Sequence, residues 1–285
     1  MRCVPRVSPG SAHTRISRRR RRFAVAWILA EFASLGGAAP TPACGVATGS
    51  AKVAAVTERA EIRLEDGRLL RLAGLDVPDA ASGGFDAAAA ARTLLTRDWA
   101  GRNVAVAWLA PRPDRWGRWL ADLATPEGST ASMELLNAGL ARVRPEFETR
   151  GCETERLSAE AAARVAGLGL WDDPDSILDP GDLDVLRAHD GRFVLVEGIV
   201  RRVGAGRSRV YLDFGRRGGF SAIVARKGES AFLLRGIALN ALLGQAIRVR
   251  GVLEDRNGFR VEVADPSMIE RLDRAEGAKE AKPGG

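Results

Sequence analysis

The chain has 285 residues and 46% hydrophobic content, which is enough for about two domains of ~150 residues each. Its formal net charge of +7 comes from the leader, because residues 1–43 carry eight arginines and one acid while the rest of the chain is neutral. After this leader His189 is the only histidine, which excludes a histidine-cluster mechanism and a multi-histidine metal site. The sequence also contains no phosphate-binding loop and no dinucleotide-binding fingerprint.

Residues 1–43 have the pattern of a secretory signal. Five arginines at 18–22 precede an apolar run at 23–30, and small residues follow up to Pro40. We therefore expect export, with the mature protein periplasmic or secreted. The apolar run is broken by Glu31 and is shorter than the ~20 residues of a spanning helix, so an uncleaved N-terminal membrane anchor is the alternative.

Only Cys44 and Cys152 remain after the leader. In an oxidising compartment they can pair as a disulfide that closes a long loop. Two cysteines do not define a framework, so two unrelated thiols are the alternative.

The first half of the remaining chain alternates short strands with helices. A tight turn at Asp66-Gly67 joins two strands with alternating apolar residues. Strands are expected at 52–56, 60–64, 68–75, 104–109 and 119–124, and helices at 85–99, 132–138 and 156–166.

An acidic, proline-bearing stretch at 172–182 indicates a domain boundary. Beyond it, strands at 192–203, 209–214, 220–225, 246–253 and 259–263, with one helix at 231–243, suggest a small Greek-key barrel of the OB type. The expected domains are 48–174 and 189–272, joined by an acidic linker at 175–188 and followed by a disordered tail at 273–285. The fold class is mainly β with helices, α+β.

Four blocks of the first domain resemble the thermonuclease, or staphylococcal-nuclease-like, family. Residues 71–79 (Arg-Leu-Ala-Gly-Leu-Asp-Val-Pro-Asp) are similar to that family's Arg-Leu-x-Gly-Ile-Asp-x-Pro-Glu segment, and residues 114–121 to its Asp-x-Tyr-Gly-Arg-x-Leu-Ala. Residues 136–143 and 159–171 resemble its asparagine to Gly-Leu-Ala stretch and its closing helix and tryptophan. The blocks are collinear and cover about residues 50–173.

The resemblance implies an OB-like barrel that cleaves phosphodiester bonds of DNA and RNA with one calcium ion. By this resemblance Arg71 and Arg118 bind phosphate, Asp76 is a calcium ligand and Asp79 is the base. Such chemistry needs carboxylate oxygens for the metal and cations for the developing phosphorane charge. The alternative for the two arginines is an ordinary ion pair with Asp76 or Asp114.

Two departures from the family pattern affect the calcium site. Ala60 stands where the family has a ligand aspartate, and Asp79 is one methylene shorter than the family's glutamate. In a regular strand the side chain of the adjacent Glu61 would point to the opposite face, whereas Glu58 could reach in from a different loop. We therefore predict an impaired calcium site.

The second domain gathers basic residues interleaved with aromatic ones, as in OB-type barrels that bind single strands. The candidate nucleic-acid contacts are Arg201, Arg202, Tyr211, Arg216 and Arg217. An ordinary solvated surface in an arginine-rich sequence is the alternative. The tryptophans at 108, 116, 119 and 171 are interpreted as core or rim packing rather than as a base-stacking platform.

The sequence thus predicts an exported thermonuclease-family protein that acts by binding nucleic acid or an envelope partner, calcium being its cofactor only if it is active. The first alternative is an active calcium-dependent nuclease that cleaves DNA or RNA. The second is a structural envelope protein that uses neither site.

Overall fold

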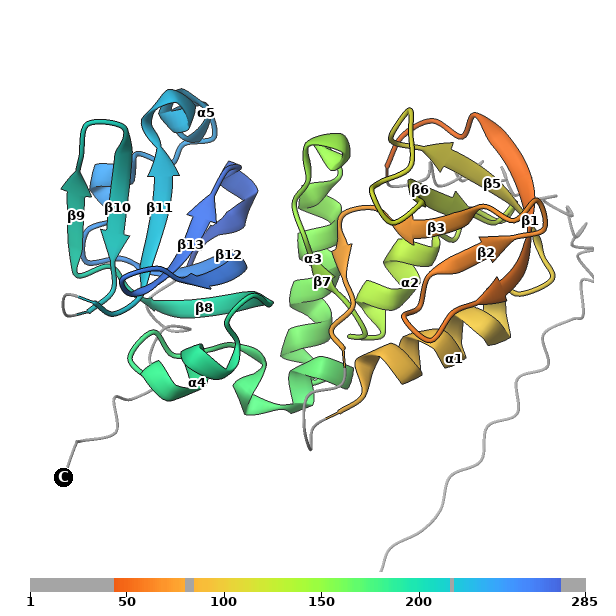
Figure 1. Ribbon diagram of the computed structural model, residues 1–285, viewed down its shortest axis with the longest axis horizontal. Helices are drawn as coiled ribbons and strands as arrows, with labels where there is room; N and C mark the ends of the chain where they lie inside the picture. Colours follow the sequence, from red (N-terminus) through yellow and green to blue (C-terminus); the bar gives the residue numbers. More distant parts are fainter. Residues whose placement is uncertain (1–43, 80–84, 216–217, 273–285) are drawn as a thin grey trace, which may run out of the picture. The chain divides into compact units, whose positions relative to one another are not determined.

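The computed structural model describes residues 44–79, 85–215 and 218–272. Its first half is a closed five-stranded barrel with the strand order β1-β2-β3-β6-β5. All neighbours pair antiparallel except β3 and β6, which are parallel. Figure 1 shows this barrel with helices packed along one side. The strands are β1 (Gly49–Val56), β2 (Ile62–Leu64), β3 (Leu69–Leu72), β5 (Asn103–Trp108) and β6 (Arg118–Ala124).

Helices α1 (Ala87–Trp99), α2 (Ala131–Asn137) and α3 (Glu153–Val165) belong to the same half. The side chains of Asp86 and Thr130 accept backbone hydrogen bonds at the starts of α1 and α2, which is how short polar residues begin helices. A small antiparallel pair, β4 (Leu75–Asp76) with β7 (Arg142–Val143), lies outside the barrel. It brings the residues after β3 next to the segment before α3.

The second half is a seven-stranded sheet with its own core. Strand β8 pairs with β12 and strand β9 pairs with β10, and only Val200 and Arg201 separate β8 from β9. The two therefore act as halves of one bent strand. Its other pairs are β10 with β11, β11 with β13 in parallel, and β12 with β13 and β14. The strands are β8 (Phe193–Ile199), β9 (Arg202–Ala205), β10 (Arg209–Asp213), β11 (Ser221–Ala225), β12 (Ala246–Asp255), β13 (Phe259–Val263) and β14 (Ile269–Arg271).

The order of pairing in this sheet is that of the first barrel, with β8/β9, β10, β11, β12 and β13 in the places of β1, β2, β3, β5 and β6. In both halves the third and fifth strands form the parallel pair. The predicted fold class, mainly β with helices and an OB-like barrel followed by a second β unit, is confirmed.

Several local expectations differ from the structure. The helix expected at 231–243 is a short α5 (Glu229–Leu234) followed by a 3-10 turn, because Gly236 takes a left-handed φ of 73° that ends the helix. The segment predicted as a linker contains α4 (Leu183–Ala188), and Leu178 and Leu186 are buried in the second core. The remaining 3-10 turns are η1 (Phe147–Thr149), η2 (Gly169–Asp172), η3 (Pro174–Ser176), η4 (Arg226–Gly228), η5 (Leu239–Leu242) and η6 (Pro266–Met268).

The two halves belong to one compact unit of the chain and share a buried network of charges. Arg250 of β12 donates to both carboxylate oxygens of Glu160 on α3, at 2.9 Å each, and to the carbonyl of Val143 at 2.8 Å. It also bonds Glu270 of β14. A small apolar cluster in which Trp171 packs with Phe193 accompanies this network.

Cys44 and Cys152 form a disulfide, with their Cα atoms 5.4 Å apart. It ties the segment before β1 to the residue that precedes α3. The signal pattern at 1–43 and the tail at 273–285 lie outside the described residues. Within the residues that are described, no helix is long and apolar enough to cross a membrane.

Candidate functional site

A pocket of about 500 Å³ opens at one end of the first barrel. Four segments line it: the turn before β2, the stretch from β3 to the residues after β4, the turn between β5 and β6, and Arg144 after β7. All four residues predicted from the sequence for catalysis and metal binding line this pocket. They are Arg71, Asp76, Asp79 and Arg118.

The turn before β2 determines what this pocket contains. Ala60 has a left-handed φ of 58°, and its amide donates to the carbonyl of Thr57 at 3.0 Å. Strand β2 therefore begins only at Ile62, and Glu61 is part of the turn. Because Glu61 precedes the strand, the alternation of a regular strand does not apply to it. Its carboxylate lies in the pocket, 3.0 Å from Nη1 of Arg118, so the expectation that it faces away is wrong.

Arg118 is held by carboxylates on two sides. Asp114 accepts from Nε at 2.9 Å and lies 2.8 Å from Nη2, while Glu61 occupies Nη1. Burial alone would raise the pKa of Asp114, but hydrogen bonds from the backbone and side chain of Arg118 hold that pKa below its usual value. The ion pair with Asp114 that the sequence left open as an alternative is therefore present, and Glu61 adds a second one.

Arg71 is paired with a residue that no sequence block indicated. Its Nη2 lies 2.9 Å from Oε1 of Glu146, and the other oxygen of Glu146 accepts from the amide of Gly74 at 3.0 Å. Arg144 lies 3.9 Å from the same carboxylate. The pairing of β4 with β7 brings these residues together, and because Glu146 is 75 residues away in sequence, no local pattern signals the contact.

Asp76 has no hydrogen bond or ion pair to its carboxylate within the part of the chain that the structure describes. Burial raises the pKa of Asp76, while the positive charges of Arg142, Arg144 and Arg71 act in the opposite direction. The loop before it is fixed by Arg156, which donates to the carbonyl of Ala73 at 2.6 Å. Asp76 is thus a carboxylate oriented by its backbone and left open to the pocket.

The donor set does not fit a calcium ion. Ala60 has no oxygen on its side chain, and Glu61 is engaged by Arg118. Asp79 is exposed at the last described position before residue 85. In the described ranges no three histidine, cysteine or acidic side chains come close enough to hold a metal ion, whereas calcium takes six to eight oxygens.

Cations and an aromatic ring surround the pocket. Trp116 at the turn between β5 and β6 is 61% exposed, and the guanidinium carbons of Arg115 and Arg118 lie 4.0 and 4.8 Å from its ring centre. Arg59 also lines the pocket. Of the four tryptophans assigned to packing, Trp171 is buried and Trp108 and Trp119 pack on the barrel core, whereas Trp116 stands at the rim of the site.

The nucleic-acid contacts predicted in the second half do not all converge. Arg202 pairs with Asp213 at 2.7 Å. Arg201 is exposed without an ion pair in the described segments, and Tyr211 lies on β10 beside Gly206. Arg216 and Arg217 lie outside the described residues.

Comparison with known proteins bears on the first half of the chain. Residues 69–173 match the family model described as staphylococcal nuclease homologue. This range contains β3, the closing helix α3 and most of the residues that line the pocket, whereas Arg59, Ala60 and Glu61 lie before it. No curated protein matches the chain significantly.

Proposed function

The chain carries a domain of the staphylococcal nuclease homologue family at residues 69–173, and from this premise we propose that its barrel binds nucleic acid without calcium-dependent cleavage. The thermonuclease-like scaffold supplies the site. The charges inside that site favour binding over chemistry.

The observation that carries the proposal is that both site arginines form ion pairs with carboxylates of the same chain. Arg118 is paired with Asp114 and Glu61, and Arg71 is paired with Glu146. Phosphodiester cleavage needs preorganised cations directed at the phosphorane as its charge develops. A guanidinium that already pairs with a carboxylate must first give up that partner, so its contribution to the transition state is reduced.

The residues at the expected calcium site support the same proposal. Calcium would supply charge neutralisation and activate water if it were bound. By the family resemblance, the buried Ala60 stands at the position of one ligand, and Asp79 stands at the position of the base with a shorter side chain. A misplacement of ~1 Å in a catalytic group can cost on the order of 100-fold in rate.

The rim of the pocket supports binding. Trp116 exposes its ring to solvent, and Arg115 stacks on it. Arg59 and Arg115 are exposed and make no ion pair within the described ranges. An exposed ring with nearby guanidinium groups offers stacking and phosphate contacts that do not depend on base sequence.

Export remains part of the proposal. The pattern of residues 1–43 supports it, and a disulfide between the two cysteines that follow the leader suits an oxidising compartment. A periplasmic or secreted site of action is therefore proposed, with an envelope protein as the alternative partner.

The test is calcium-dependent cleavage of single-stranded DNA by residues 44–285. We expect no cleavage by the wild type, with or without chelator, and retention of the strand at low salt. The variant Ala60→Asp with Asp79→Glu restores the family's carboxylates, and aspartate tolerates the left-handed backbone at position 60. Cleavage that appears in this variant and vanishes in chelator would show that the scaffold is intact and lacks only its carboxylates.

One observation favours an active nuclease as the second candidate. The carboxylate of Glu61 lies inside the pocket, so it could act as a metal ligand if it left Arg118. Wild-type cleavage that requires calcium and is lost in both Glu61→Gln and Arg118→Ala would establish this candidate and refute the binding-only proposal. Failure to retain any nucleic acid at low salt would instead favour the structural envelope role.

A further inference from the structure

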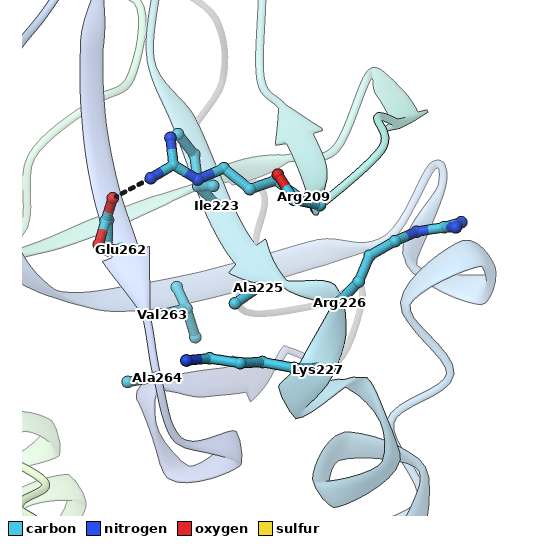
Figure 2. Close-up of a pocket in the computed structure, with 9 residues that line it drawn as sticks. Arg209, Ile223, Ala225, Arg226, Lys227, Glu262, Val263 and Ala264 are labelled. Atoms are coloured by element: carbon cyan, nitrogen blue, oxygen red, sulfur yellow. Dashed lines mark hydrogen bonds and ion pairs between the residues drawn. The ribbon is translucent and has the colours of Figure 1, made fainter.

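A second pocket, of about 570 Å³, lies on the outer face of the second sheet. Figure 2 shows the strands β10, β11 and β13 around it, with Arg209 reaching across to Glu262. Their side chains are 3.2 Å apart. The residues that line this pocket include Arg209, Ile223, Ala225, Arg226, Lys227 and Glu262.

The pairing registers place this pocket at the position that the candidate site has in the first barrel. Val210 is opposite Val224, which is opposite Val263, just as Ile62 is opposite Leu70 and Leu70 opposite Trp119. Both rows cross the second, third and fifth strands of their half.

An ion pair lies beside each of these rows. Glu61 precedes Ile62 by one residue and Arg118 precedes Trp119 by one residue, and the two are paired. In the second half, Arg209 precedes Val210 by one residue and Glu262 precedes Val263 by one residue, and these two are also paired. The same position in both halves therefore holds a cross-strand ion pair, with its charges exchanged in the second.

The second pocket differs from the first in its free cations. Arg226 and Lys227 follow the end of β11 and make no ion pair within the described ranges. Figure 2 shows Lys227 extending toward Val263 and Ala264, whereas Arg226 points away from the strands. With the charge of Arg209 balanced by Glu262, the lining residues retain an excess positive charge.

Apolar and aromatic side chains lie beside these cations. Ile223 and Ala225 line the pocket, and Tyr211 pairs with Ile223 across β10 and β11 on the same outer face. The ring of Tyr211 lies against Gly206, where an added Cβ would be only 3.4 Å from it. A cationic edge beside a flat apolar and aromatic surface matches the backbone and bases of a single strand.

We propose that this face binds single-stranded nucleic acid, with phosphates against Arg226 and Lys227 and bases against the exposed Ala225 and the ring of Tyr211. The inference does not require the first barrel to bind or cleave anything. It replaces the set of contacts predicted from the sequence by a different one on the same sheet, with Tyr211 common to both.

The test measures the anisotropy of a fluorescein-labelled oligothymidylate with the full chain over a range of salt concentrations. In Arg226→Ala with Lys227→Ala, we expect weaker binding and a salt slope smaller by about 1.4, because each phosphate contact to a single strand contributes about 0.7. The matched control is Arg192→Ala with Arg235→Ala, which removes two exposed arginines of the same half away from the pocket. It should leave the slope near that of the wild type.

Two further arms identify the ligand and the site. Inorganic polyphosphate that competes as well as the oligonucleotide would overturn the proposal, because it carries phosphates without bases. Tyr211→Ala should weaken the binding of the oligonucleotide and leave the binding of polyphosphate unchanged. If Trp116→Ala abolishes oligonucleotide binding while the Arg226 and Lys227 variant matches the control, the oligonucleotide binds at the first barrel. This outcome refutes the inference but leaves the proposed function standing.

Discussion

The buried pair of Arg250 and Glu160 couples the stability of the two halves. The side chain of Arg250 is 0% exposed, and its guanidinium contacts Glu160, Glu270 and the carbonyl of Val143. Arg250→Met would keep most of the volume but leave the fully buried carboxylate of Glu160 without its main partner. Removing one member of a buried ion pair costs about 3–5 kcal/mol.

The tryptophans make this prediction measurable. Those in the described residues lie at 99, 108, 116, 119 and 171, all in the first half, whereas Arg250 belongs to the second. Selective excitation of tryptophan during thermal unfolding therefore reports the first half. We expect Arg250→Met to lower the Tm of this signal by about 6–20 °C, taking 2–4 °C per kcal/mol for a chain of this size.

The double variant Arg250→Met with Glu160→Leu serves as the control. Replacing both members of a buried pair by apolar groups is often neutral or stabilising, so it should recover much of the loss. A tryptophan transition unchanged in Arg250→Met, together with a lower-temperature component in the far-ultraviolet circular dichroism of the whole chain, would refute the coupling and show that the halves unfold independently.

Three other perturbations follow from the geometry. Cys44→Ser with Cys152→Ser should lower the Tm in calorimetry, since the loop-entropy account assigns about 4–5 kcal/mol to a loop of this length; reductant should lower the Tm of the wild type alone. Gly74→Ala should lower the urea midpoint by an equivalent of about 1–3 kcal/mol, because Gly74 has a φ of +70° and an added Cβ would clash with Arg156. Asp76→Asn should raise the urea midpoint at neutral pH. Burial raises the pKa of Asp76 in the folded state, so its ionisation opposes folding above that pKa, and the gain of the variant should disappear as the pH falls and Asp76 takes up a proton.

Much of the fold could be predicted because its signals are local. The turn at Asp66-Gly67 and the alternating residues around it place β2 within two residues of its observed bounds and the start of β3 within one, although the strand expected at 68–75 is divided into β3 and β4. The break of the strand expected at 192–203 was missed. Every residue from Phe193 to Ala205 is compatible with a strand, and the bend at Val200 and Arg201 arises from pairing with β12 on one side and β10 on the other.

The four site residues predicted from the sequence line one pocket, but the sequence does not indicate the carboxylates Glu146 and Glu61 that pair with its arginines. The blocks around Arg71 and Arg118 led to the pocket because most of the residues that line it lie within residues 71–79 and 114–118. The partner of Arg71 depends on β4 pairing with β7, and that long-range contact leaves no periodic pattern in the sequence. A regular strand would turn Glu61 to the opposite face, but Ala60 is left-handed and β2 begins only at Ile62.

The exchanged ion pairs show what a site in this type of barrel requires. At this position a charge at the start of the second strand (Arg209) or just before it (Glu61) pairs with an opposite charge on the fifth strand, and the cation is on a different strand in each half. Such a pair cannot by itself be evidence of phosphate chemistry. The two pockets differ in where their unpaired cations lie. In the first pocket these cations lie at the rim around Trp116. In the second pocket Lys227 extends across the strands that line it. The free cations, rather than the paired arginines that resemble catalytic residues, therefore identify where a polyanion should bind.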